Sequence, residues 1–187
     1  IEPLGQTIEV EDGQTILDAA LRAGIYLPHA CCHGLCATCK VQVVDGEVCA
    51  VCLSDDLTQA VGEPVLLFRA SEAPWGQSHT GTKKQGGVTD GPFLHRGSGG
   101  RLLMLWSSFG EGGYKQAVAH SQSGTILGPW TQEAQPIYGD DGGHGMLFSR
   151  FDRQLMLVLH QPNRGSLERP RLFEVAEQDG TLHLTPY

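Results

Sequence analysis

All six cysteines of this 187-residue chain lie between positions 31 and 52. A secreted disulfide-rich domain spreads its cysteines along the chain, whereas a crowded set indicates a metal or cluster site in a reducing compartment. Cys31, Cys36 and Cys39 follow the spacing C-x4-C-x2-C, which is typical of thiolates that hold a 2Fe-2S cluster. We therefore expect a cluster-type loop in the first quarter of the chain and a cytoplasmic location.

The residues around this loop predict a short α+β segment. Residues 6–10, QTIEV, alternate apolar and polar side chains as a strand does. Thr15 can cap a helix whose apolar face includes residues 16, 17, 20 and 21, and Gly24 can end it. Residues 40–44 predict a second strand.

Beyond residue 48 the helical period disappears, and short apolar runs alternate with Gly, Pro, Ser and Asp turns. This pattern is typical of an all-β fold, and the 25 glycines agree with many turns. The runs are 64–68, 102–106, 116–119, 146–148, 155–159 and 171–175.

A repeat lies within this β region. Residues 90–96, DGPFLHR, align with residues 144–150, HGMLFSR, and the same offset aligns 101–105 with 155–159. Repeats of about 50 residues with several short strands indicate propeller blades. The alternative is a β-sandwich in which two hairpins match by chance.

Charge and hydropathy exclude some partners. The formal net charge of −8 argues against nucleic acid and anionic membranes. No apolar run approaches the roughly 18 residues that a membrane span needs. The opening residues show no basic or apolar signal region, so we expect that a signal peptide is absent or removed.

Residues 1–48, including GQTIEVEDGQTILDAALRAGIYLPHACCHGLCATCKVQVVDGEV, resemble the plant-type ferredoxin domain of multicomponent oxygenase reductases. This resemblance implies a 2Fe-2S cluster on Cys31, Cys36, Cys39 and a fourth ligand far beyond the third. Only Cys49 and Cys52 follow, and both lie closer to Cys39 than the family's fourth ligand does.

Three hypotheses for the cysteines therefore stay open. A 2Fe-2S cluster could use Cys49 or Cys52 as its fourth ligand, and a zinc site could combine some of the cysteines with His29 or His33. The third hypothesis is a truncated segment, residues 1–48, that holds free thiols and no cluster.

From about residue 45 to the end, the chain resembles glycoside hydrolase family 43. The motifs are SEAPW (71–75), VTDGPFLHR (88–96), GRLLMLWSSFGEGGYKQAVAHS (100–121), GPWTQ (128–132) and GGHGMLF (142–148). The resemblance implies a five-bladed β-propeller with a central active site that hydrolyses arabinofuranosyl or xylosyl linkages. We expect a mainly β chain with about two and a half blades in residues 49–187.

Inverting hydrolysis needs a carboxylic acid and a carboxylate base. The resemblance implies Glu72 or Asp90 as the acid: the family motif favours Glu72, and the position at the start of a blade favours Asp90. Either residue could instead cap a turn. The base and the third carboxylate that the resemblance implies have no matching motif in this sequence. Activity would therefore need a substitute carboxylate from Asp140, Asp141, Glu111 or a partner chain.

The resemblance also implies substrate-binding residues. His144 should face the channel and help to hold a divalent ion or water, unless it bonds only to neighbouring backbone. Trp75, Trp106 and Phe109 are candidate platforms for sugar stacking. Arg169 is a candidate partner of a carboxylate or sugar hydroxyl, and a surface salt bridge is the alternative.

We therefore expect a protein of the family-43 glycosidase type, acting on pentose-containing glycans, with an incomplete catalytic set. A non-catalytic carbohydrate-binding protein and a 2Fe-2S electron-transfer protein are the alternatives. Because a partial propeller exposes sheet edges, we also expect a homodimer that completes the ring.

Overall fold

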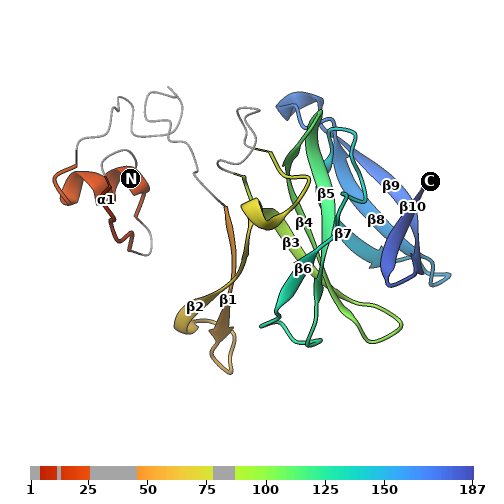
Figure 1. Ribbon diagram of the computed structural model, residues 1–187, viewed down its shortest axis with the longest axis horizontal. Helices are drawn as coiled ribbons and strands as arrows, with labels where there is room; N and C mark the ends of the chain where they lie inside the picture. The colour runs from red at the N-terminus through yellow and green to blue at the C-terminus, as the bar shows by residue number, and fades with distance from the viewer. Residues whose placement is uncertain (1–4, 12–13, 26–45, 78–86) are drawn as a thin grey trace. The chain divides into compact units, whose positions relative to one another are not determined.

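The computed structural model describes residues 5–11, 14–25, 46–77 and 87–187 (Figure 1). The chain divides into two compact units, residues 1–42 and 43–187. The junction predicted at residue 48 lies near this division.

The first unit contains helix α1 (Ile16–Arg22). Thr15 forms a capping box: its Oγ1 accepts a hydrogen bond from the Asp18 N–H at 3.1 Å, and the Asp18 carboxylate accepts one from the Thr15 N–H. Gly24 follows the helix with φ +76°, a conformation that glycine adopts without strain. The predicted helix and both of its ends are confirmed.

The strand predicted at residues 6–10 is wrong, because these residues have no regular secondary structure. Alternating side chains favour a strand only where a neighbouring strand supplies hydrogen bonds, and no described strand pairs with this segment. The second predicted strand, 40–44, lies outside the described residues.

The second unit is built from antiparallel strands, in sheets of order β1-β2, β3-β4-β5-β6 and β10-β9-β8-β7. The strands are β1 (Glu47–Leu53), β2 (Ala60–Arg69), β3 (Asp90–Arg96), β4 (Leu102–Gly110), β5 (Gly113–Ser121), β6 (Trp130–Gln132), β7 (Gly143–Ser149), β8 (Leu155–Gln161), β9 (Arg169–Gln178) and β10 (Thr181–Pro186). Two 3-10 turns, Ala70–Glu72 and Gly165–Leu167, lie between them.

Each four-stranded sheet runs antiparallel in sequence order, as a propeller blade does. Every apolar run named in the sequence falls within a strand. The described sheets do not close into a ring, so the unit is consistent with part of a propeller. The mainly β fold class is confirmed.

The offset of the internal repeat is 53 residues, and not the 54 residues that separate the aligned segments 90–96 and 144–150. In the first hairpin Arg96 pairs with Leu102, and in the second Ser149 pairs with Leu155, a shift of 53 residues in both strands. The sequence alignment matched Arg96 with Arg150, but Arg150 follows β7 and lies in the turn. The two identical arginines thus favour an alignment that is one residue out of the strand register.

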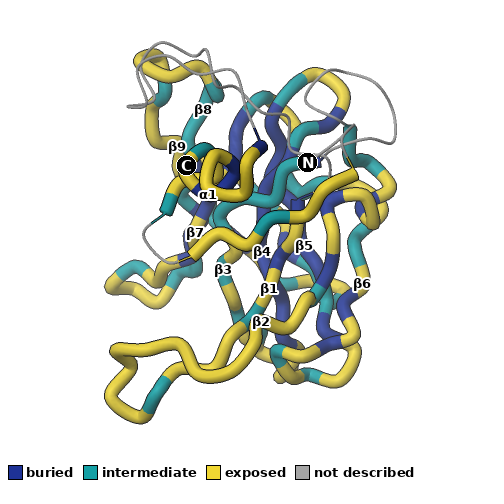
Figure 2. Tube along the Cα trace, turned by 90° about the vertical axis from the view of Figure 1, so that its left-hand side faces the viewer, coloured by how far each residue is buried: buried dark blue, intermediate teal, exposed yellow. Residues whose placement is uncertain are grey.

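The apolar core has two parts, one on each face of the β3–β6 sheet. In the first, Phe68 from β2 packs edge-on against Trp106 from β4, with ring centroids 5.2 Å apart. The second joins this sheet to β7–β10 through residues such as Leu105, Leu157 and Phe173. Strand β4 is therefore buried almost throughout, whereas the β1–β2 hairpin is largely exposed (Figure 2).

Within the described part of the chain, no helix is long and apolar enough to cross a membrane.

Candidate functional site

Asp90, the first residue of β3, is the centre of a polar cluster. The Tyr114 hydroxyl donates a hydrogen bond to Asp90 Oδ2 at 2.5 Å, and His144 Nδ1 lies 3.2 Å from the same oxygen. The side chains of Asp90 and His144 are 43% and 57% exposed, whereas Tyr114 is buried. The cluster thus has one face open to solvent and one face set in the fold.

Aromatic rings complete this group. The rings of Tyr114 and His160 stack with centroids 5.5 Å apart and an interplanar angle of 16°. His144 lies 6.5 Å from His160, and Phe109 lies 5.2 Å from Tyr114 between ring centroids. We call Asp90, Tyr114, His144 and His160 the Asp90 cluster. Strands β3, β5, β7 and β8 supply its members, so both four-stranded sheets must be in place to form it.

Two buried polar side chains fix the backbone of His144. Ser107 Oγ accepts a hydrogen bond from the His144 N–H at 2.8 Å and donates one to Gln116 Oε1. Gln116 Oε1 also accepts the Gly145 N–H at 2.6 Å. Because Ser107 and Gln116 are fully buried, these bonds form in a low dielectric and hold the start of β7 against β4 and β5.

The backbone is tight where β3 meets β7. Gly91 has φ +54°, and a Cβ at this position would lie 2.8 Å from Cδ2 of His144. His144 itself has φ +53°, which is uncommon for a residue with a side chain and costs about 1–3 kcal/mol unless its surroundings enforce it. The Ser107 hydrogen bond supplies such enforcement.

Burial raises the pKa of the Tyr114 hydroxyl far above its usual value, and the hydrogen bond and charge of Asp90 raise it further. Tyr114 therefore stays a neutral donor at working pH. Asp90 Oδ1 takes part in no hydrogen bond with the residues that the structure describes. This oxygen is available to a ligand.

The structure places Glu72 in a different role. It ends the Ala70–Glu72 turn, and its Oε1 accepts the Arg69 N–H at 2.8 Å. It is exposed and makes no hydrogen bond to the Asp90 cluster within the described residues. Of the two candidate acids, Asp90 is the one that lies in the cluster, and Glu72 caps a turn.

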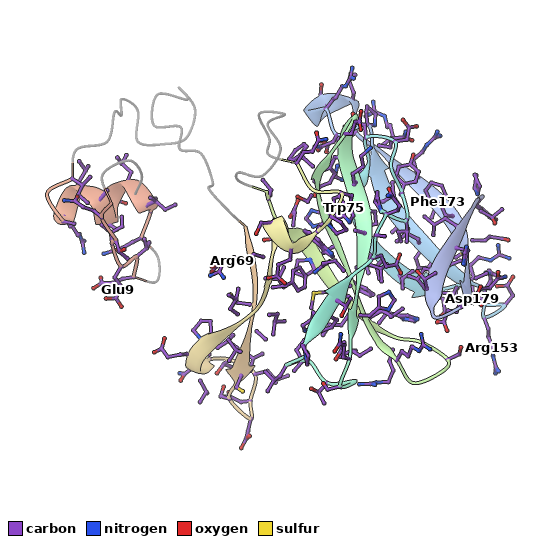
Figure 3. All side chains as sticks on the ribbon, in the orientation of Figure 1. Glu9, Arg69, Trp75, Arg153, Phe173 and Asp179 are labelled. Atoms are coloured by element: carbon purple, nitrogen blue, oxygen red, sulfur yellow. The ribbon has the colours of Figure 1, made fainter. Side chains whose placement is uncertain are left out.

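The three aromatic candidates separate by burial. Trp106 is fully buried, and its Nε1 donates to Gln132 Oε1 at 2.9 Å, so the sugar-stacking role predicted for it is not compatible with the structure. Trp75, labelled in Figure 3, is half-buried, and its ring centroid lies 5.3 Å from that of Trp106. Phe109 is half-buried beside Tyr114 and is the candidate that adjoins the Asp90 cluster.

Arg169 lies at the surface, where its Nη1 donates to the carbonyl oxygens of Ser166 and Glu168. It therefore stabilises the Gly165–Leu167 turn. No hydrogen bond or ion pair joins it to Asp90 in the described part of the chain.

The carboxylates considered as substitute bases are mostly engaged in structure. Asp141 Oδ1 accepts the Tyr114 N–H at 3.2 Å, and its Oδ2 lies 3.7 Å from Arg164 Nε. Asp140 accepts a hydrogen bond from the Gln161 side chain. Glu111 lies in the exposed turn between β4 and β5. Among the described residues, Asp141 is thus linked to the cluster through the backbone of Tyr114.

Cys49 and Cys52 lie on β1 as exposed free thiols. The other proposed ligands, Cys31, Cys36 and Cys39, and the histidines His29 and His33 lie outside the described residues. Among the residues that are described, no three His, Cys, Asp or Glu side chains are placed to hold a metal ion. The described residues near His144 therefore offer no such ligand set for the divalent ion expected there.

The start of the chain matches the family model described as the 2Fe-2S iron-sulfur cluster binding domain, over residues 1–66. It is 77% identical over 48 residues to the phenol 2-monooxygenase reductase component DmpP of Pseudomonas sp. (strain CF600), a match that covers 26% of this chain and 14% of that protein. Phenol hydroxylase P5 protein of Acinetobacter pittii (strain PHEA-2) is 74% identical over 46 residues, covering 25% of this chain and 13% of that protein. The chain thus spans about one seventh of these relatives.

Solved structures resemble the rest of the chain. An endo-arabinase from Bacteroides thetaiotaomicron VPI-5482 superposes with a TM-score of 0.66 at 44% identity, over 72% of this chain and 48% of that one. A thermostable family-43 glycoside hydrolase gives a TM-score of 0.61 at 22% identity, over 75% of this chain and 47% of that one. This chain therefore joins a ferredoxin-type start to a fold shared with family-43 glycoside hydrolases, of which it spans about half.

Proposed function

We propose that residues 43–187 bind arabinose- or xylose-containing glycans at the Asp90 cluster. The observation behind this proposal is that Tyr114 and His144 both engage one oxygen of Asp90 and leave the other open. An ionised carboxylate accepts hydrogen bonds from sugar hydroxyls, and charge-assisted bonds of this kind are the stronger ones. The likeness to the endo-arabinase at 44% identity supports a pentose-containing glycan as the ligand.

The cluster is suited to recognition because its geometry is set before a ligand arrives. Ser107 and Gln116 fix the His144 backbone, and the stacked rings of Tyr114 and His160 leave little freedom to either side chain. Binding to a preorganised site loses less conformational entropy than binding to a mobile one. The exposed ring of His144 supplies a further polar contact for a sugar hydroxyl.

Hydrolysis at the same cluster is the second candidate. Asp90 in its protonated form would give its proton to the leaving oxygen as the glycosidic C–O bond breaks. A base would take a proton from the water whose oxygen bonds to the anomeric carbon, and in inverting enzymes it lies about 6.5–9.5 Å from the acid. Because Asp140 and Asp141 are engaged in structure, we propose that Glu111 or a carboxylate of a second chain supplies this base.

Calorimetric titration with short arabino- and xylo-oligosaccharides tests the binding proposal. We expect the wild-type chain to bind one of them and Asp90→Asn to bind it at least about tenfold more weakly, which is about 1.4 kcal/mol. Asp55→Asn is the matched control, because Asp55 is an exposed carboxylate in the β1–β2 turn. Equal affinity of Asp90→Asn and wild type would contradict the proposal.

Release of nitrophenol from aryl arabinofuranosides and xylosides separates the two candidates. Release that is lost in Asp90→Asn but kept in Asp55→Asn supports hydrolysis. Oligosaccharide binding without any release supports a carbohydrate-binding protein.

The family match over residues 1–66 favours electron transfer as a separate function of the first part of the chain. In that case Cys31, Cys36 and Cys39 would hold a 2Fe-2S cluster with Cys49 or Cys52. Visible absorption together with iron and zinc analysis tests this, with Cys49→Ser and Cys52→Ser to identify the fourth ligand. A colourless protein without iron would remove this function, and zinc would indicate the alternative site.

A further inference from the structure

A cavity of about 210 Å³ lies between the turn that joins β3 to β4 and the turn that joins β9 to β10. It begins where β3 ends, whereas Asp90 is the residue at which β3 starts. The first and last of the seven residues of β3 are separated by six rises of roughly 3.3 Å, about 20 Å in all, so the cavity is separate from the Asp90 cluster. Its lining residues are Gly97, Ser98, Gly99, Arg101, Leu103, Glu177, Gly180 and Thr181.

One wall presents a fixed negative charge. Glu177 Oε1 lies 2.7 Å from His95 Nε2, and its Oε2 accepts the Ser98 N–H at 2.6 Å. The His95 hydrogen bond, followed by that of Ser98, lowers the pKa of Glu177 to about 2. The carboxylate is therefore ionised at working pH, and each oxygen keeps a lone pair for a further donor.

The opposite charge comes from Arg101. Its guanidinium makes no hydrogen bond or ion pair with other residues of the described ranges. Its Nη1 lies against the backbone of Gly180, so that a Cβ at Gly180 would overlap it. Arg101 therefore has donors free for a ligand, while its guanidinium lies beside the β9–β10 turn.

The cavity is preformed, because two links tie the β9–β10 turn to the neighbouring sheet. Glu177 forms the first, through His95 and Ser98. The Thr181 hydroxyl forms the second by donating to Glu133, which also contacts His120 Nε2 at 2.8 Å. A preformed wall lowers the entropy that a ligand must overcome.

We propose that this cavity is a second, non-catalytic site for one uncharged sugar or polyol. Arg101 and Glu177 give the lining no net formal charge, and they offer donors on one side and an acceptor on the other. A hydroxyl both donates and accepts, so a polyhydroxylated ligand satisfies both groups, and Leu103 packs on its C–H face. The volume lies below the roughly 300–1,000 Å³ of clefts for larger ligands, so a single ring fits.

This site does not depend on the function proposed for the Asp90 cluster. The test is an NMR titration of the full chain with L-arabinose and with D-xylose, following the backbone amides of Ser98, Gly99 and Gly180. We expect saturable shifts of these amides with at least one sugar in wild type, and at least tenfold weaker binding in Arg101→Met. Asp90→Asn should bind as wild type does at this cavity.

Arg153→Met is the matched control, because Arg153 is an exposed arginine in the β7–β8 turn whose side chain points away from the sheets (Figure 3). Thermal unfolding of Arg101→Met should match that of wild type, since Arg101 is exposed and takes part in no described side-chain bond. Sugar binding in Arg101→Met equal to that of wild type would overturn the proposal. So would shifts of these amides with inorganic phosphate and with neither sugar.

Discussion

At the scale of single residues, the molecule concentrates its unusual chemistry on Asp90. One oxygen of this carboxylate receives two partners, from strands that are far apart in sequence, and the other oxygen takes part in no hydrogen bond with the described residues. The buried tyrosine is the stronger determinant of this geometry, because its ring stacks on His160 and cannot leave without unpacking. The tyrosine hydroxyl is therefore the group to remove first.

We predict that Tyr114→Phe weakens glycan binding about three- to tenfold and destabilises the fold by about 1–2 kcal/mol, because it removes a hydrogen bond to a charged acceptor. Calorimetric titration and urea unfolding measure the two effects. Tyr138→Phe provides the same change in a half-buried tyrosine that packs on Phe173, and it should leave binding unchanged. Unaltered glycan affinity in Tyr114→Phe would show that the hydroxyl does not position Asp90 for a ligand.

The sequence was sufficient to single out Asp90 and His144, because both stand beside glycines at the starts of repeated strands. It could not reveal Tyr114, His160 or Ser107. Tyr114 reaches Asp90 only when β3, β4 and β5 pair, whereas His160 reaches Tyr114, and Ser107 the His144 backbone, only when the two four-stranded sheets pack together. A signal was present: Ser107 and Ser108 follow an apolar run, and buried polar side chains usually have a hydrogen-bond partner.

For Trp106 the sequence predicted a role at the site, whereas the structure places the residue in the core. A tryptophan that stacks on a sugar and one that fills a core have the same appearance in a sequence. Only the burial of β4 on both faces distinguishes them.

At the scale of elements, strand β4 holds the two parts of the core together. Leu105 faces one part and Trp106 the other, and both are fully buried. Residues on the two faces of this strand therefore contribute to the packing of all three sheets.

We predict that Trp106→Ala destabilises residues 43–187 by about 3–5 kcal/mol, the usual cost of removing a large buried ring. Urea unfolding followed by fluorescence and circular dichroism measures this cost. Leu127→Ala is the control, because Leu127 is 62% exposed and should change stability by less than about 0.5 kcal/mol. A loss below 1 kcal/mol in Trp106→Ala would contradict the burial described above.

The contact between the two four-stranded sheets should depend on pH through Glu177. Its pKa is lowered from 4.5 to about 2 by His95 and then Ser98, so the folded state favours the ionised form. The resulting stability is fully present above about pH 4.5 and is lost as the pH falls through 2.

Glu177→Gln should therefore lower the melting temperature at pH 6, and the difference from wild type should shrink as the pH approaches 2. Differential scanning calorimetry across this range measures it. A difference that stays constant from pH 6 to pH 2 would show that the carboxylate charge is not the stabilising feature.

At the scale of the whole molecule, the chain carries about half of the fold seen in its structural neighbours. The β1–β2 hairpin exposes apolar side chains that include Leu53, Val61 and Val65, at 53%, 52% and 48%. Within the described residues this sheet has only two strands, so both of its edges are open to pairing. These features favour a second copy of the chain as the partner.

We predict that the chain is a homodimer in solution, with twice the 20.2 kDa mass of one chain. Size-exclusion chromatography with light scattering measures the mass. The double variant Val61→Lys, Val65→Lys should be a monomer, since burial of two charges opposes pairing. Leu127→Lys should leave the dimer intact. A stable wild-type monomer at working concentration would contradict the prediction.

The sequence predicted the join between two unlike parts and the β-blade pattern, because motif spacing and turn residues are local. It did not predict the blade register. Shifting the alignment of two similar hairpins by one residue changes the number of identical residues only a little. The same shift changes which residue of one hairpin corresponds in the structure to each residue of the other.

The most direct test of the central claim, that the Asp90 cluster binds a glycan, is an NMR titration of the full chain with an arabino-oligosaccharide. The claim predicts saturable shifts of the backbone amides of Gly91, Tyr114, His144 and Gly145, and loss of these shifts in Asp90→Asn. Binding that leaves these four amides unshifted, or that persists unchanged in Asp90→Asn, would contradict it.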